Sequence, residues 1–313
     1  PLNLARLAVE FSQSNMDVSS LNANTVTLTN TTSGSPVILS GFSFSTSTDS
    51  QIVQNMLSII PGALTANTSY TLTVKTGVKN SSNIFLPGPF ISQFTTGGAN
   101  DTTAPQVIAV LPTPGTTIPA NTSDFLLVFD ENIDQTTATS GAITLAVAGG
   151  SNLPGAVFYD PLSKEAHFQP NNVLPVGANL VLTLKGASLR NVSGITLGNN
   201  VTRNWQVEAV NSDTTGPTIL FANGDDFGLA ISFDEAVNVN DVLDLTKYSL
   251  TVGGVSQTLS SLAGHRVAYE GLTRTARISG IKLQSGVSFT ISVSGVSDIS
   301  CNVMSAASSF TGT

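Results

Sequence analysis

The chain has 313 residues, of which 41% are hydrophobic and only 10% charged, so it can bury more than one core and is not disordered as a whole. Its net charge is −8 and its 12 Lys and Arg residues are scattered singly, which excludes a basic surface for nucleic acid. A single cysteine, Cys301, excludes an internal disulfide. No segment approaches the roughly 18 consecutive apolar residues of a membrane span, so we expect none in this chain.

Three landmarks recur in the same order along the chain, at spacings of about 105–118 residues. The first is a strand-like run that ends in Phe before a polar or acidic cluster: Leu7–Phe11, Leu126–Phe129 and Leu229–Phe233. The second is a leucine, a polar turn and an alternating strand: Leu64–Val74, Leu174–Leu184 and Leu283–Val293. The third is an aromatic residue in a short closing strand: Phe94, Trp205 and Phe310. The chain therefore contains three copies of one unit.

The elements predicted within each copy are short β-strands. In the first copy Tyr70, Leu72 and Val74 alternate with threonines, which is the period of two of a half-buried antiparallel strand. Copies of about 100 residues with about seven such strands are typical of an immunoglobulin-like sandwich. Exceptions to the strand pattern are a short helix predicted at Asp49–Ile59 and single turns after the acidic clusters, at Asp134–Thr139 and Asn240–Leu245.

The joins between copies share the pattern Asp-Thr-Thr-x-Pro, at Asp101–Pro105 and Asp213–Pro217. Proline fixes its own φ and keeps its predecessor extended, so each join should be short and stiff. We therefore predict an all-β fold, a tandem array of three immunoglobulin-like β-sandwich domains that span residues 1–99, 100–211 and 212–313.

The first copy differs from the others because it lacks its opening strand. About twenty residues precede the Phe strand in the second copy after Asp101, whereas only a few precede Leu7 in the first. An incomplete sandwich leaves an unpaired edge, which natural proteins cover. Two explanations stay open: the chain is a fragment whose missing strand lies upstream, or another subunit adds a strand and so polymerises the protein.

The joins and the strands after them resemble the bacterial Ig-like repeats of S-layer proteins and surface adhesins, the SbsA-type or Big_5-like Ig domains. The second copy matches best, through Asp101–Pro105, Leu111–Gly115 and Phe129–Asp134. The third has Asn223–Asp226 in place of the Pro/Gly loop, and the first lacks the Asp-Glu pair. The resemblance implies an extracellular tandem Ig-like protein of a prokaryotic cell surface.

Carboxylates at the joins and after the Phe strands are the candidate metal ligands. A join carboxylate near a loop carboxylate and backbone carbonyls would form the oxygen cage that Ca²⁺ prefers. An aspartate before Thr-Thr-x-Pro is also explained as a turn former, and Asp-Glu after a strand as a solvated loop. The candidates are Asp101, Asp130, Glu131, Asp134, Asp213, Asp234 and Glu235.

No catalytic constellation stands out, so we do not expect an enzyme. His167 and His265 are interpreted as surface strand or turn residues, and neither has a Ser or Cys in a recognisable nucleophile motif nearby. Trp205 occupies the closing-strand position of the second copy, which favours core packing over carbohydrate stacking. No catalytic or organic cofactor is expected, and Ca²⁺ is the one ion considered.

The composition and the resemblance favour a non-catalytic structural protein that is secreted or attached to the cell surface. It would be a building block of an S-layer, stalk or extracellular filament, associating with itself or with other surface components. Its low charge supports this, because neutral polar surface is cheaper to desolvate than charged surface. The alternatives are a spacer in a larger adhesin and an accessory Ig region of a secreted enzyme.

Overall fold

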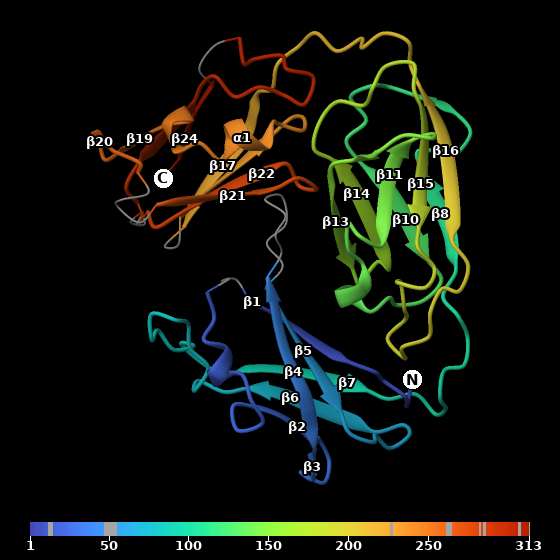
Figure 1. Ribbon diagram of the computed structural model, residues 1–313. Coiled ribbons are helices and arrows are strands. Elements are labelled where there is room, and N and C mark those ends of the chain that lie inside the picture. The colour runs from blue at the N-terminus through green and yellow to red at the C-terminus, as the bar shows by residue number, and fades with distance from the viewer. Residues whose placement is uncertain are drawn as a thin grey trace.

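The computed structural model describes residues 1–11, 15–46, 55–225, 228–260, 265–281, 283, 286–305 and 308–312. These residues form an all-β tandem array of three sandwiches, in which six sheets pair along the chain around three hydrophobic cores (Figure 1). We call them the first, second and third repeats, after their order in the chain. None of the described helices has the length or apolar composition needed to cross a membrane.

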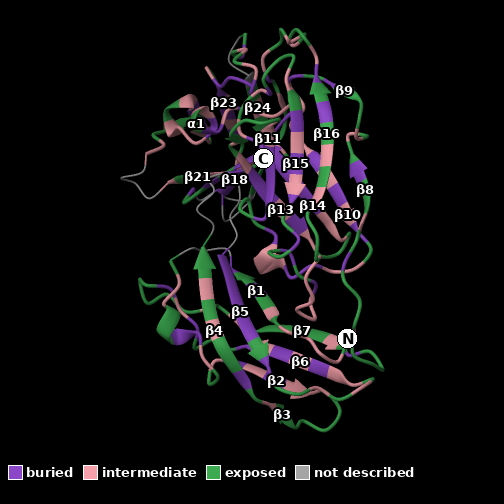
Figure 2. Ribbon diagram, turned by 45° about the vertical axis from the view of Figure 1, so that its right-hand side comes forward, coloured by how far each residue is buried: buried purple, intermediate pink, exposed green. Residues whose placement is uncertain are grey.

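The first repeat contains β1 (Leu7–Phe11), η1 (Val18–Ser20), β2 (Val26–Asn30), β3 (Pro36–Val37), β4 (Leu39–Thr46), β5 (Asn55–Pro61), β6 (Ser69–Val74) and β7 (Phe90–Thr95). Its sheets have the strand orders β1-β5-β4 and β3-β2-β6-β7. The predicted alternation holds in β6, where Tyr70, Leu72 and Val74 are buried between the sheets. β5 is buried along most of its length, whereas β4 is largely exposed (Figure 2).

The second repeat contains β8 (Val107–Leu111), β9 (Thr117–Ile118), β10 (Phe125–Phe129), η2 (Gln135–Thr137), β11 (Ile143–Val147), β12 (Asn152–Leu153), β13 (Gly155–Asp160), β14 (Glu165–Pro170), β15 (Asn179–Leu184) and β16 (Val201–Val207). Its sheets have the orders β13-β14-β10-β8 and β12-β11-β15-β16-β9. The opening strand β8 lies antiparallel to β10, and β9 then pairs in parallel with β16. The segment after the first join therefore contributes to both sheets.

The third repeat contains β17 (Ile219–Asp225), β18 (Gly228–Phe233), α1 (Val239–Val242), η3 (Leu245–Lys247), β19 (Tyr248–Val252), β20 (Val255–Gln257), β21 (Arg266–Glu270), β22 (Thr275–Ser279), β23 (Phe289–Val293) and β24 (Ser308–Gly312). Its sheets have the orders β17-β18-β22-β21 and β20-β19-β23-β24. β17 takes the place beside β18 that β8 takes beside β10.

The repeat alignment is confirmed in the cores. Phe11, Phe129 and Phe233 are buried, with 9%, 1% and 1% of their surface exposed. Leu72, Leu182 and Ile291 are buried at equivalent places in the second sheet of each repeat. Trp205 is also in the core, as predicted, and its Nε1 donates a hydrogen bond to the Pro112 carbonyl over 3.1 Å.

The helix predicted at Asp49–Ile59 is wrong for its described part. Residues 49–54 lie outside the described residues, and β5 begins at Asn55. β5 is the middle strand of its sheet, and its residues Asn55–Ile59 are buried in succession, so side chains on both of its faces are covered and the sequence does not alternate. The two predicted turns are confirmed: Asp134 caps η2, and α1 and η3 lie within or next to Asn240–Leu245.

Candidate metal centre in the third repeat

The structure brings two of the seven predicted carboxylates together with a third carboxylate that sequence reasoning missed. Oxygen atoms of Asp213, Glu235 and Asp298 lie within 4.8 Å of one another. Asp213 comes from the join between the second and third repeats, and Glu235 follows β18. Asp298 follows β23 and is fully buried. We call these three residues the acidic triad.

Local hydrogen bonds hold the triad residues in place. The Asp213 Oδ1 accepts a hydrogen bond from the Thr215 N–H over 3.2 Å, which is the turn geometry expected before Thr-x-Pro. Asp298 accepts hydrogen bonds from both the backbone N–H and the side-chain amide of Asn302, over 2.8 and 2.9 Å. Asn121, from the second repeat, donates to Asp213 Oδ2 over 3.3 Å. The triad is thus built by a join and by the repeat that follows it.

The electrostatics of the triad favour a bound positive charge. Burial, together with the negative charges of Asp298 and Asp213, raises the pKa of Glu235 from 4.5 to about 7. Burial and the charge of Asp213 also raise the pKa of Asp298. Both carboxyls resist ionisation because like charges meet in a partly desolvated place. A proton or a cation relieves that repulsion, and three carboxylates are the hard oxygen ligands that Ca²⁺ takes.

The second repeat has the same arrangement with one decisive substitution. Asp101 and Glu131 occupy the places of Asp213 and Glu235, but the third residue is Asn191. The buried Asn191 Nδ2 lies within hydrogen-bond distance of Asp101 Oδ2, Glu131 Oε2 and the Thr103 carbonyl, at 2.6, 3.0 and 3.1 Å. An amide nitrogen therefore stands among three oxygens and supplies the positive dipole that the third repeat lacks.

The other three predicted ligands lie outside both clusters, and each makes a local hydrogen bond. Asp130 accepts from the Gln106 N–H and Asp234 from the Thr218 N–H, both over 2.8 Å, at the start of the opening strands. Asp134 caps η2 by accepting from the Thr136 N–H over 3.0 Å. These carboxylates fix strand and turn ends.

A fourth landmark in the sequence would have identified the missed residues. Asn80, Asn191 and Asp298 each stand two residues before a serine, five to seven residues after the end of the second-landmark strand. In the first two, the Asn Oδ1 accepts two backbone hydrogen bonds from its own loop; in the third, Asp298 Oδ1 accepts from the Asn302 N–H. We call this the Asx loop of each repeat.

Both joins are tied to the repeats on either side. Asn3 exchanges two hydrogen bonds of 2.9 Å with the backbone of Asp101, and the Ala5 N–H donates to the Val192 carbonyl over 2.8 Å. At the second join Asn121 contacts Asp213, and the Val173 N–H donates to the Ile299 carbonyl over 3.2 Å. Each join aspartate therefore contacts a residue of the preceding repeat and lies at the Asx loop of the following one.

His167 corrects one prediction, because it is buried and not a surface residue. β14 pairs on both sides, and the His167 Nδ1 lies 2.8 Å from the Asp124 Oδ2. Such a pair resembles the base and orienting acid of a hydrolase. Within the described residues, however, no serine, threonine or cysteine is hydrogen-bonded to the ring, so the nucleophile of such a site is missing there.

Comparison with known proteins matches the second repeat to a protein family. The family model described as "Bacterial Ig-like domain" matches residues 101–207, from the first join to the end of β16. A search of the curated proteins finds no match.

Solved structures give distant similarities. The N-terminal part of the bacterial S-layer protein SbsC is 14% identical, with a TM-score of 0.30, over 66% of this chain and 43% of that chain. The FN1–FN3 domains of chicken CNTN1 are 11% identical, with a TM-score of 0.22, over 99% of this chain and 95% of that chain. The chain thus spans less than half of the first of these structures.

Proposed function

We propose that this protein, whose residues 101–207 form a bacterial Ig-like domain, is a non-catalytic structural component of the prokaryotic cell exterior. The observation that carries this proposal is the structure of the joins. Each join aspartate, Asp101 or Asp213, is hydrogen-bonded to an asparagine of the preceding repeat and lies beside the Asx loop of the following repeat. Joins of this kind suit a structural protein that keeps its domains at a fixed distance from one another. We propose boundaries at 1–99, 100–211 and 212–313 for the three domains.

We further propose that the protein assembles laterally, as a building block of an S-layer, stalk or filament. The outer face of β23 and β24 carries neutral hydroxyl pairs that are hydrogen-bonded to each other, Ser292 with Ser309 over 2.7 Å and Thr290 with Thr311 over 3.0 Å. Packing such a face against a neighbour costs less desolvation free energy than packing lysines and glutamates.

Electron microscopy of the purified protein tests the assembly proposal. Ordered sheets or filaments would support a self-assembling building block. Isolated particles at all concentrations would contradict it and favour the other two roles, a spacer in an adhesin or an accessory region of a secreted enzyme.

For the acidic triad, we propose a Ca²⁺ site that fixes the second join. The site uses Asp213, Glu235 and Asp298, and the raised pKa values of Glu235 and Asp298 support it. Asp101 and Glu131 are not proposed as a second Ca²⁺ site, because Asn191 already lies among their oxygens.

The exposed Cys301, three residues after Asp298, allows a direct measurement of Ca²⁺ binding. It is the only thiol in the chain, so an environment-sensitive fluorophore attached there reports on the Asx loop. We expect a saturable response to CaCl₂ that the substitution Asp298→Asn abolishes, since it reproduces the residue of the second repeat. Asp130→Asn, outside the triad, is the matched control and should keep the response. Loss in both variants, or no response in the unmodified chain, would contradict the site.

A further inference from the structure

In the second and third repeats, the segment that follows the join lies against the Asx loop before it becomes the opening strand. In the second repeat Asn191 contacts Asp101 and Thr103, and Gln106 then exchanges hydrogen bonds with Asp130. In the third, Gly216 lies so close to the backbone of Val303 that a Cβ added there would be 2.4 Å from its carbonyl oxygen.

The first repeat has the same groove, but no described segment occupies it. A cleft of about 170 Å³ lies between β1 and the Asx loop, lined among others by Phe11, Met16, Asn80, Ile84 and Leu86. Phe11 is the equivalent of Phe129, and Asn80 is the equivalent of Asn191. The cleft therefore lies where the segment after Asp101 runs in the second repeat.

The sheet beside this groove is one strand short. β1 pairs with β5, and the described sheet stops there in the order β1-β5-β4, whereas β10 also pairs with β8. The core of the first repeat is correspondingly less covered at this edge. Leu7 is only partly buried, whereas Phe125, which has the equivalent place in the second repeat, is fully buried. Phe11, the last residue of β1, lines the groove, so the groove meets β1 at the end of this strand.

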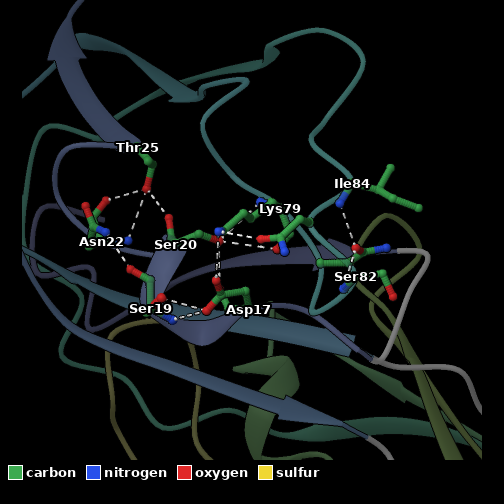
Figure 3. A network of polar contacts seen from close by, with 10 residues as sticks. Asp17, Ser19, Ser20, Asn22, Thr25, Lys79, Ser82 and Ile84 are labelled. Atoms are coloured by element: carbon green, nitrogen blue, oxygen red, sulfur yellow. Dashed lines mark hydrogen bonds and ion pairs between the residues drawn. The ribbon is translucent and has the colours of Figure 1, made fainter.

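Hydrogen bonds within the Asx loop of the first repeat fix the shape of the groove. The Asn80 Oδ1 accepts hydrogen bonds, both over 3.0 Å, from the N–H groups of Ser82 and Ile84, which are labelled in Figure 3. The Asn191 Oδ1 accepts the equivalent pair of loop hydrogen bonds in the second repeat. Lys79 is held beside it, with its Nζ 3.6 Å from Asp17 and 5.8 Å from the centre of the Phe85 ring. Its ammonium group also donates a hydrogen bond to Asn83 Oδ1 over 2.8 Å, so it is anchored within the first repeat.

We propose that the groove and the edge of β1 dock an extended segment of the type Asp-Thr-Thr-x-Pro followed by an aliphatic strand. The partner is such a segment leaving another Ig-like repeat of the same kind, so the docked state continues the two joins within this chain. Its strand pairs antiparallel with β1, as β8 pairs with β10, and its alternate aliphatic side chains cover Leu7. The inference rests on the proposed tandem architecture and extends it to a third join.

A peptide with the sequence of Asp101–Leu111 tests the proposal on the full chain. Carrying a fluorophore at its C-terminus, the peptide should bind with one-to-one stoichiometry in fluorescence polarisation. Hydrogen exchange should slow at β1 and at the Asx loop of the first repeat. A peptide with aspartate in place of Val107 and Val110 should not bind, because its apolar face is lost.

Two exposed isoleucines of the first repeat provide the variant and its control. Ile84, which is 64% exposed and lines the groove, is changed in Ile84→Asp; Ile38, which is 83% exposed, does not line the groove and is changed in Ile38→Asp. We expect Ile84→Asp to weaken peptide binding by at least about tenfold and Ile38→Asp to leave it unchanged.

Three results would overturn the proposal. One is the absence of peptide binding, and another is equal binding to both variants. The third is self-association of the chain that Ile84→Asp abolishes while the peptide stays unbound, because the groove would then be an interface between whole copies. Peptide binding is independent of sheet or filament formation, so this proposal and lateral assembly fail separately.

Discussion

Glu235 gives the acidic triad a pH dependence with a definite sign. Its pKa is raised to about 7 in the folded protein, so between pH 4.5 and 7 the folded state binds a proton that the unfolded state has released. The contribution of Glu235 to the free energy of unfolding therefore falls as the pH rises through this window. Asp101 and Asp213 have lowered pKa values and titrate at more acidic pH. Their contribution to the free energy of unfolding is lost as the pH falls, so its pH dependence has the opposite sign to that of Glu235.

We predict that, with chelator present, the melting temperature of the third repeat falls between pH 4.5 and 7.5. Ca²⁺ should reverse most of this loss at pH 7.5, where the carboxylates are charged, and have little effect at pH 4.5. Calorimetric scans at several pH values measure both. Glu235→Gln should flatten the dependence, and a chelated wild-type protein that becomes more stable over this range would contradict the assignment.

Under the proposed Ca²⁺ site, a single residue distinguishes the third repeat, which would bind the ion, from the second, which would not. Asn191 and Asp298 are of nearly the same size and stand in the same loop, yet one donates hydrogen bonds to its acidic neighbours and the other repels them. The sequence permitted Asp213 and Glu235 to be proposed as ligands. Asp298 was missed because it lies far along the chain and the fourth landmark was not used; the backbone pairing of Val237 with Asp298 brings it beside the loop that carries Glu235.

At the scale of elements, the strand that ends in Phe sets the stability of each sandwich. Phe129 is almost fully buried and packs edge-on against the Tyr159 ring, with 6.4 Å between ring centres. We predict that Phe129→Ala lowers the free energy of unfolding of the second repeat by about 3–5 kcal/mol. Trp205, the only tryptophan, lies in that repeat, so denaturant titration followed by its fluorescence isolates the transition.

Phe233→Ala is the control for this prediction, since Phe233 belongs to the core of the third repeat. It should leave the Trp205 transition nearly unchanged. A shift of equal size in both variants would mean that the second and third repeats unfold together. A shift of less than about 1 kcal/mol in Phe129→Ala would contradict the repeat alignment.

Many strands and core residues were predictable because apolar and polar residues alternate along each of these strands, a pattern that can be seen within a few consecutive residues. β6 and β15 bury every second residue, and the sequence shows this directly. β5 was misjudged because its residues Asn55–Ile59 are buried in succession, so the alternation that marks a strand in the sequence is absent there. His167 was misjudged for a similar reason, since its partner Asp124 lies 43 residues away and satisfies a ring that would otherwise need water.

At the scale of the whole molecule, Ca²⁺ should act on the second join more than on any fold. Asp213 belongs to the join, and Glu235 and Asp298 belong to the third repeat, so the ion would link the two. We predict that small-angle scattering gives a narrower distribution of interdomain distances with Ca²⁺ than with chelator, while circular dichroism stays the same. Asp298→Asn should show no Ca²⁺ response. Identical wild-type profiles would leave these carboxylates as turn residues.

The pairing of β9 with β16 has a mechanical consequence. These two strands lie parallel, one near the start and the other at the end of the second repeat. Once β8 has been drawn away from β10, a pull on the two ends of the repeat draws β9 and β16 in opposite directions along their common axis, so the hydrogen bonds between them carry the load together.

The closing strands of the other two repeats lack a parallel partner in the described sheets: β7 pairs with β6 and β24 with β23, and each is an edge. The same pull can peel such an edge away one bond at a time. Under tension the second repeat should be the last of the three to open, and the array would lengthen in steps from its ends while its centre holds.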